Sequence, residues 1–350
     1  MARWLGPWAG TATSPAGIAQ HDDILEGDRP IRVRVYHPRG HPRGRPRSVY
    51  LIAPGLHYAG ADDPRQDRFC RVLATAGHLV LAPVLKDFAD LLPTPRVIDD
   101  FERVWRARGR WDPEVRPPVI FSISFGSLAS IGLAARVGAG GLARLILFGG
   151  YGSFSSILRY CLAGEVPGRT PKAREPLNQP VVFMSFVHDL DPPCPDPDAV
   201  LDAWREYVRR TWGRPEMKAP ERRVEVGLEI ARRIPESVRQ LYLHGIGLTP
   251  DWLPFALRCV RRGAERGAAL DALPYLADVR CKVDIMHGVN DNVIPYEQAQ
   301  VLAAGMVHAD VRVHLTGLYD HSGGARPSLA TAVREVATML RLLEILANPE

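Results

Sequence analysis

Cysteine is scarce in this sequence, and the few cysteines are scattered. The five cysteines are odd in number and include no C-x-x-C pair, so we expect neither a disulfide framework nor a cysteine-ligated metal cluster. They are Cys70, Cys161, Cys194, Cys259 and Cys281. No run of about 18 uncharged apolar residues occurs, so we expect no membrane span. Residues 1–8 contain one basic residue and no sustained apolar stretch, unlike a signal peptide, and we therefore expect a cytoplasmic protein.

Familiar motifs for cofactors, metals and nucleic acids are also missing. The chain contains no P-loop and no H-E-x-x-H motif. Residues 138–143 match G-x-G-x-x-A, but they end a predicted helix and precede a predicted strand, which reverses the order of a dinucleotide site. The basic stretch at residues 37–47 lacks interleaved aromatic residues and is typical of a solvated loop. We expect no cofactor, no metal and no nucleic-acid partner.

The chain does contain enough apolar sequence for a sizeable core. Of its 350 residues, 46% are hydrophobic and 24% are charged, which suits one large α/β domain with an insertion or two smaller domains. Apolar strand-like runs alternate with helical stretches, which indicates a mostly parallel sheet covered by helices on both faces. The first two runs, at about 22–25 and 31–36, would form its antiparallel edge. Further strands are expected at 48–53, 78–83, 119–124, 145–148, 281–286 and 311–315, and core helices at 63–76, 95–108 and 328–347.

The alternation stops after Gly152, and residues 153–278 are mainly helical in pattern. The clearest helices lie at 199–212, 221–234, 236–243 and 252–266, whereas the apolar run at 181–187 fits a strand or a buried helix equally. A helical block between two core strands is typical of a cap over the strand ends, where ligands bind in open α/β sheets. We therefore predict a core of residues 1–152 and 279–350, with residues 153–278 as a helical cap, or lid, inserted before the last two core strands.

The most informative segment is VIFSISFGS, at residues 119–127, where an apolar run ends at a serine and leads into a helical pattern. A strand that turns this sharply into a helix strains its corner residue, and the positions two before and two after it must be small. Ser122 and Gly126 meet this demand around Ser124. Such a corner would place the hydroxyl of Ser124 beside the first N–H groups of a helix, which favours a nucleophile for acyl transfer.

A serine hydroxyl becomes a good nucleophile only when a base accepts its proton, and two later segments supply the missing groups. Asp291 follows a predicted strand, and its carboxylate would orient an imidazole and stabilise the protonated form. His321, thirty residues later, lies in a glycine-rich loop past the last strand and would be the base for Ser124. Asp320 could replace Asp291 only awkwardly, because adjacent residues seldom face one another, and His287 is more typical of packing at a strand end.

An acyl-transfer site also needs two donors for the oxyanion. One would be the N–H of Phe125, directly after the nucleophile. The other should come from the turn after the third strand, where Gly55 permits a tight turn. The N–H of Leu56 is our first choice for this donor, and that of His57 is the second.

Together, these motifs resemble the α/β-hydrolase superfamily. They are Pro54-Gly55-Leu56, Ser122-x-Ser124-x-Gly126, His287-Gly288-x-x-Asp291-x-x-x-Pro295 and Asp320-His321-Ser322. The resemblance covers about residues 20–150 and 279–347, and the order Ser, Asp, His is the one that this fold uses. It implies an eight-stranded, mostly parallel sheet, a Ser124–His321–Asp291 triad and no cofactor. Ser122 stands where the family usually has the first glycine of the elbow, and Pro54 where it commonly has a histidine.

We therefore expect a serine hydrolase that cleaves a carboxylic ester, or a thioester, of a small molecule through an acyl-enzyme. The same triad would serve an acyltransferase that passes the acyl group to an alcohol or amine, and competition between acceptors separates the two. A catalytically silent binding protein on a hydrolase scaffold is the alternative from another class.

Overall fold

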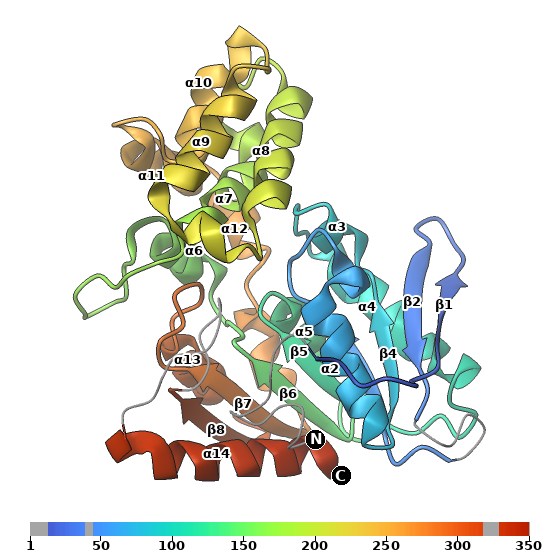
Figure 1. The fold of residues 1–350 in the computed structure, drawn as a ribbon. Helices are drawn as coiled ribbons and strands as arrows, with labels where there is room; N and C mark the ends of the chain where they lie inside the picture. The colour runs from blue at the N-terminus through green and yellow to red at the C-terminus, as the bar shows by residue number, and fades with distance from the viewer. Residues whose placement is uncertain (1–12, 39–44, 318–328, 350) are drawn as a thin grey trace.

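A computed structural model describes residues 13–38, 45–317 and 329–349, apart from the side chains of residues 329–334. These residues form an eight-stranded sheet in the order β1-β2-β4-β3-β5-β6-β7-β8 (Figure 1). Strand β2 is antiparallel to β1 and β4, and every other neighbouring pair is parallel. The strands are β1 (Gln20–Leu25), β2 (Ile31–Tyr36), β3 (Val49–Ala53), β4 (Leu79–Pro83), β5 (Val119–Ile123), β6 (Arg144–Phe148), β7 (Lys282–Gly288) and β8 (Asp310–Thr316). The predicted mostly parallel sheet with an antiparallel edge is confirmed.

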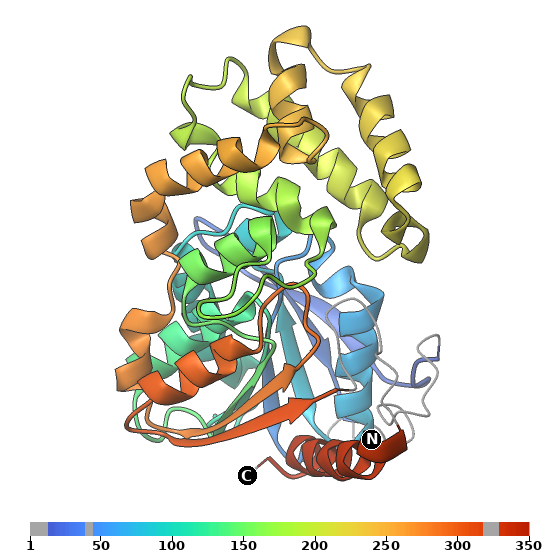
Figure 2. The same ribbon diagram turned by 90° about the vertical axis from the view of Figure 1, so that its left-hand side faces the viewer.

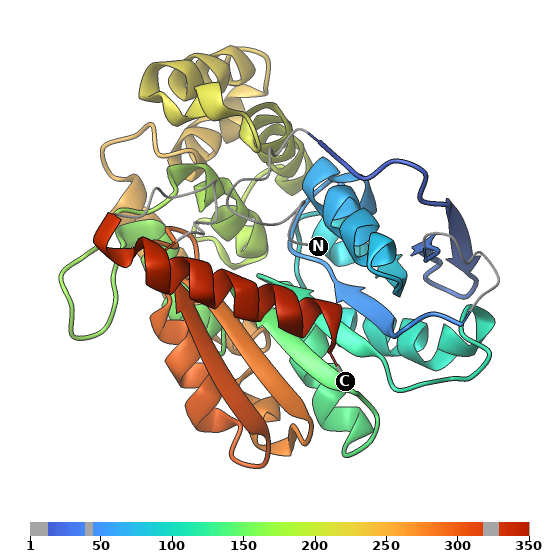
Figure 3. The same cartoon turned by 60° about the horizontal axis from the view of Figure 1, so that its bottom comes forward.

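Helices cover both faces of the sheet. Alternate residues of a strand point to opposite faces, and in the buried strands the side chains on both faces are apolar. On one face, Ile52 and Phe121 belong to an apolar cluster with α2 and α14, which lie on the same side of the sheet (Figure 3). On the other face, Leu51 and Ile120 belong to a second cluster with α4 and α5. The core helices are α2 (Pro64–Thr75), α3 (Lys86–Ala89), α4 (Arg96–Arg106), α5 (Gly126–Val137), α13 (Glu297–Gly305) and α14 (Leu329–Ala347). None of the described helices is both long enough and apolar enough to cross a bilayer.

Between β6 and β7 the chain forms only helices and loops, and these lie on the side of the molecule away from α14 (Figures 1 and 2). The helices are α6 (Phe154–Ala163), α7 (Gln179–Ser185), α8 (Pro197–Thr211), α9 (Pro220–Ala231), α10 (Glu236–Gly245), α11 (Trp252–Arg262) and α12 (Ala264–Ala268). We keep the name cap for residues 153–278; its limits and its action as a lid stay predictions.

Two local features of the cap differ from the sequence pattern or resolve it. The ambiguous run at 181–187 is mostly the buried helix α7. The single helix expected over 252–266 is interrupted at Gly263, between α11 and α12. The ring of Phe186 packs against this glycine so closely that a Cβ there would lie 2.2 Å from its Cδ1 atom. The local helical pattern did not reveal this break, because the packing at Gly263 involves a residue far away in the sequence.

The two segments that join the cap to the core are hydrogen-bonded to each other. The carbonyl oxygen of Gly152 accepts from the N–H groups of Ala272 (2.9 Å) and Leu273 (3.2 Å). The side-chain oxygen of Gln298, on α13, accepts from the N–H groups of Gly152 and Ser153, both at 3.0 Å. The entry to the cap and its exit are thus fixed to one point on the core.

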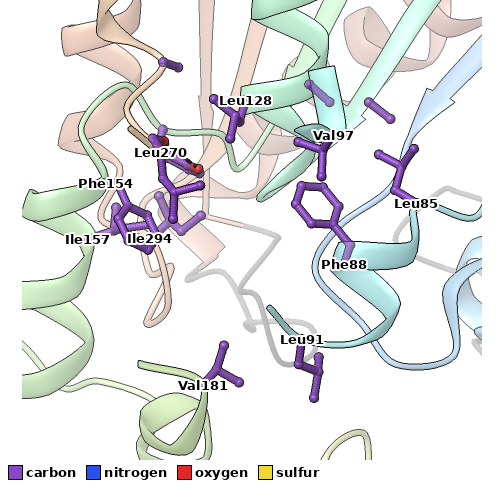
Figure 4. Close-up of a cluster of buried hydrophobic side chains, with 14 of the residues drawn as sticks. Leu85, Phe88, Leu91, Val97, Leu128, Phe154, Ile157, Val181, Leu270 and Ile294 are labelled. Carbon is purple, nitrogen blue, oxygen red and sulfur yellow. Dashed lines mark hydrogen bonds between the residues drawn. The ribbon is translucent and has the colours of Figure 1, made fainter. Parts of the chain in front are cut away.

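Apolar packing also continues from the core into the cap. Figure 4 shows part of one buried cluster, in which Phe154 and Ile157 of α6 lie close to Leu270 and Ile294. Val181 of α7 belongs to the same cluster. Burial of large apolar side chains contributes about 1.5–3 kcal/mol each, so this shared cluster stabilises the position of the cap.

We expect the buried His78 to make the fold sensitive to acid. His78 is fully buried beside Tyr50, and burial lowers the pKa of its imidazole to about 4. In the unfolded chain the pKa of this imidazole is about 6.5. Between that pH and about pH 4, His78 is therefore protonated in the unfolded state but remains neutral in the native state. The contribution of His78 to the free energy of unfolding is therefore fully present above about pH 6.5. It falls by about 2–3 kcal/mol as the pH is lowered towards 4.

Urea unfolding of the protein and of His78→Phe at pH 7 and pH 4.5 measures this contribution. The free energy of unfolding should change less between the two pH values in His78→Phe, whatever the constant effect of the substitution on packing. Equal pH dependence in the two proteins would contradict the assignment.

Candidate active site

Ser124 lies at the sharp turn between β5 and α5. Its φ angle is 51°, in the left-handed region that side chains with a Cβ rarely adopt. Its N–H donates to the carbonyl of Phe148 (2.8 Å), and its own carbonyl accepts from the N–H (3.1 Å) and Oγ (2.7 Å) of Ser127. These bonds hold the strained corner, and Ser124, 7% exposed, lines a cavity of about 640 Å³.

Gly126, two residues after Ser124, faces the backbone of the neighbouring strand. A Cβ on Gly126 would lie 2.4 Å from the carbonyl oxygen of Ala53 and 2.9 Å from that of Pro54. Neither oxygen can move without shifting β3 or the loop that follows it. The small residue that the sequence pattern required is thus required by contact with β3.

We expect Gly126→Ala to destabilise the fold by about 1–3 kcal/mol, because overpacking against a backbone forces the chain to shift. A matched control is Gly109→Ala, whose new methyl group would meet only Cγ2 of Val115 at an ordinary 3.5 Å. Thermal melts of both variants measure the difference. A melting temperature for Gly126→Ala as high as that of the control would contradict the packing argument.

Asp291 lies in the loop after β7, and its carboxylate is held in a defined orientation. Its Oδ1 atom accepts from the N–H groups of Val293 and Ile294, both at 2.8 Å. Its Oδ2 atom is 3.5 Å from Nε2 of His287, and the hydroxyl of Tyr160, on α6, donates to the Asp291 carbonyl at 2.9 Å. A buried carboxylate fixed in this way can orient a neighbouring N–H group without moving itself.

His287 is fully buried at the end of β7. Its Nε2 atom lies 2.9 Å from the carbonyl oxygen of Ile294, which fits an Nε2–H donor. The ring therefore ties the Asp291 loop to the strand, which is the packing role expected from the sequence.

His321 and Asp320 lie outside the described residues. Strand β8, which precedes them, is parallel to β7, with Thr316 opposite Gly288. The N–H of Val289 donates to the carbonyl of Thr316 at 2.9 Å, so the chain after β8 starts at the sheet edge where the Asp291 loop begins. The role of His321 stays a prediction.

The two predicted oxyanion donors both line the cavity with Ser124. Phe125 directly follows the nucleophile, and Leu56 follows Gly55, where a Cβ would lie 3.8 Å from Cβ of Ser124. Among the described residues, no hydrogen bond engages the N–H of Phe125 or of Leu56. Both groups are thus unused donors beside the nucleophile, although their joint action on an oxyanion stays a prediction.

His57, the second choice for the oxyanion donor, is tied into its own loop. Its Nδ1 atom accepts from the N–H of Ala59 (3.2 Å) and lies 3.4 Å from Oδ2 of Asp63, and its ring stacks on Tyr58. Burial is the main cause that lowers the pKa of His57, so the ring is neutral at neutral pH. These contacts fix the side chain of His57 in the cavity wall.

Residues of the cap and of two core helices, α2 and α14, complete the cavity, and the sequence pattern did not reveal them. The cap contributes an apolar wall that includes Leu158, Val181 and Trp212, with the exposed Arg214 and Lys218 beside it. Gln66 of α2 and Leu342 of α14 lie in the wall on the core side. No motif marks these residues, because each is brought to the cavity by helix packing.

Within the described ranges, no group of three or more His, Cys, Asp or Glu residues is placed to hold a metal ion.

Solved structures with the same architecture were found, although no protein-family model and no curated protein sequence matches the chain. An acylaminoacyl peptidase in complex with Z-Gly-Gly-Phe-chloromethyl ketone aligns over 93% of this chain, with a TM-score of 0.50 and 9% identity. A 2,6-dihydroxy-pseudo-oxynicotine hydrolase aligns over 95% of this chain and 67% of its own, with a TM-score of 0.50 and 12% identity. This chain has the α/β-hydrolase fold. It spans about two fifths of the acylaminoacyl peptidase, 41% of that chain.

Within the α/β-hydrolase fold, the observed strand order places the Ser124 and Asp291 motifs at one edge of the sheet. Ser124 follows β5, Asp291 follows β7, and His321 comes after β8, so all three come after the carboxyl ends of parallel strands. A sequence identity near 10% is evidence for a shared fold but not for a shared reaction. An activity has to be inferred from the side chains of this chain.

Proposed function

We propose that this protein is a serine hydrolase that cleaves a carboxylic ester, or a thioester, through an acyl-enzyme on Ser124. The observation that carries the proposal is the strained Ser124 corner in the wall of a mostly apolar cavity. Beside it lie the N–H groups of Phe125 and Leu56, which make no hydrogen bond with the described residues. Strain of this kind costs about 1–3 kcal/mol and is typical of functional sites. The fixed carboxylate of Asp291 supports the same proposal, because a triad needs an orienting acid at this sheet edge.

In the proposed reaction, His321 takes the proton of Ser124 as its oxygen attacks the acyl carbon. The N–H groups of Phe125 and Leu56 stabilise the resulting oxyanion, and His321 then protonates the departing alcohol or thiol. Water, activated by His321, attacks the acyl-enzyme and releases the acid and the free serine. Asp291 stabilises the imidazolium that forms in each half of the cycle.

A fluorophosphonate probe tests whether the site is active, because it reacts covalently with an activated serine. We expect one equivalent of probe on the protein, located by peptide mass spectrometry on Ser124. Saturating phenylmethanesulfonyl fluoride, added first, should prevent labelling. A protein that stays unlabelled after prolonged incubation would favour the silent binding scaffold over the enzyme.

A further inference from the structure

The cap holds the main chain of Asp291, the predicted acid of the triad. The hydroxyl of Tyr160, on the cap helix α6, donates to the carbonyl of Asp291 at 2.9 Å. The carbonyl of the next residue, Asn292, accepts from the N–H of Glu175, also in the cap, at 2.9 Å. We name residues 291–294 the acid loop. Two successive carbonyls of this loop are therefore hydrogen-bonded to the cap.

Tyr160 is buried between the cap and the core, outside the cavity wall. It is 1% exposed and does not line the cavity, although Leu158 and Cys161 on the same helix do. Burial raises the pKa of its hydroxyl to about 12, so the group stays protonated at neutral pH and has one hydrogen to donate. That hydrogen can reach two carbonyl oxygens, at 2.9 Å on Asp291 and at 3.2 Å on Ala173. The shorter bond is the one to Asp291.

The bonds inside the acid loop fix the carboxylate relative to that loop. Its Oδ1 atom accepts from the N–H groups of Val293 and Ile294, both at 2.8 Å. On the core side, Nε2 of His287 lies 2.9 Å from the carbonyl oxygen of Ile294. On the cap side, Tyr160 binds the carbonyl of Asp291 itself. Movement of the acid loop would carry the carboxylate with it, and the cap restrains this movement at Asp291.

Ion pairs also join the cap to the core near the acid loop, but they are closer to the surface. Nζ of Lys172 lies 2.8 Å from Oε1 of Glu297, and Nε of Arg169 lies 3.2 Å from the same oxygen. Ion pairs near the surface contribute little to stability, because water screens the charges. A buried carbonyl that loses its partner leaves an unsatisfied acceptor, which is costly. The loss of the Tyr160 hydroxyl should therefore disturb Asp291 more than the loss of either ion pair.

We propose that Tyr160 is a positioning residue for the reaction. Its hydroxyl lets the cap hold Asp291 where the carboxylate orients the imidazole of His321. This inference rests on the proposed serine hydrolase, with Asp291 as the acid of its triad. The cap then contributes to the chemical step and not only to the cavity wall.

The test is Tyr160→Phe, which keeps the buried ring and removes only the hydroxyl. In single-turnover acylation by p-nitrophenyl butyrate, we expect the rate at saturating ester to fall about ten- to a hundredfold, as a misplacement of the order of 1 Å would cause. The ester concentration that gives half of the maximal rate should change by less than about twofold, because Tyr160 does not line the cavity. A residue that only shaped the cavity would change this concentration instead.

A double-mutant cycle with Asp291→Asn separates positioning of the acid from general support of the fold. Once the charge of Asp291 has been removed, the exact place of that side chain matters little. Tyr160→Phe should therefore lower the acylation rate of Asp291→Asn by less than about twofold. A purely structural role of Tyr160 would lower the rate by the same factor in both backgrounds, because independent effects multiply.

Tyr151→Phe is the matched control. Tyr151 is also a buried tyrosine outside the cavity wall, and its hydroxyl donates to the carbonyl of Leu270, in the cap, at 3.2 Å. This bond joins the core to the cap without involving the acid loop. Thermal melts of Tyr151→Phe and Tyr160→Phe should show similar losses of stability, whereas acylation by Tyr151→Phe should match that of the parent protein.

Three outcomes would overturn the inference: an unchanged maximal rate in Tyr160→Phe, a full loss from Tyr160→Phe in the Asp291→Asn background, or an equal loss of rate in Tyr151→Phe. Each leaves the proposed function standing if acylation still requires Ser124. Acylation that does not require Ser124 would instead refute the proposed function, and the inference with it.

Discussion

Replacing Ser124 with alanine is expected to lower kcat for an activated ester by about a millionfold, because the acyl-enzyme can no longer form. The fold should be retained, since alanine keeps the Cβ, and the backbone bonds of the corner to Phe148 and Ser127 do not involve the lost hydroxyl. Hydrolysis of p-nitrophenyl esters and covalent labelling by a fluorophosphonate measure the two losses. Residual activity would report only the contribution of the oxyanion donors and of binding.

Ser122→Ala is the matched control for this prediction. Ser122 is buried, two residues earlier in β5, and its hydroxyl makes no hydrogen bond with the described residues. Its removal should leave kcat and labelling close to those of the parent protein. Full turnover in Ser124→Ala would refute the assignment of the nucleophile, and loss in Ser122→Ala alone would move it to the neighbouring serine.

Replacing Asp291 with asparagine is expected to lower kcat on the order of 10³–10⁴-fold. Asparagine keeps a carbonyl oxygen that can accept from the N–H groups of Val293 and Ile294, so the loop should keep its shape. What disappears is the negative charge that would hold the imidazole of His321 in the correct tautomer and stabilise its protonated form. Single-turnover acylation by an activated ester is the direct measurement, since both proton transfers depend on that imidazole.

Asp320→Asn is the comparison that tests the placement of the acid. Asp320 is the adjacent carboxylate in the sequence and would face His321 only awkwardly, so this variant should keep most of its activity. A large loss in Asp320→Asn together with near-normal rates in Asp291→Asn would contradict our assignment and place the acid beside the base.

Local sequence was sufficient for the strands and for the corner at Ser124. Buried parallel strands such as β3 and β5 are continuous apolar runs, and the strained turn demands small neighbours, so both leave a mark within a few residues. The break at Gly263 left no such mark, because Phe186, which packs on that glycine, lies far away in the chain. The apolar run at 181–187 was undecided for the same reason, since its burial depends on partners that local periodicity does not name.

The sequence by itself determined the alternation of strands and helices, the serine at the end of β5 and the acid after β7, because each depends on neighbours along the chain. Only the tertiary structure decided which side chains surround that serine. The cavity wall beside it joins residues from β5, β6, β7, α2 and α14, which lie far apart in the sequence. Burial and hydrogen bonding are properties of a packed neighbourhood, and a linear pattern does not contain that neighbourhood.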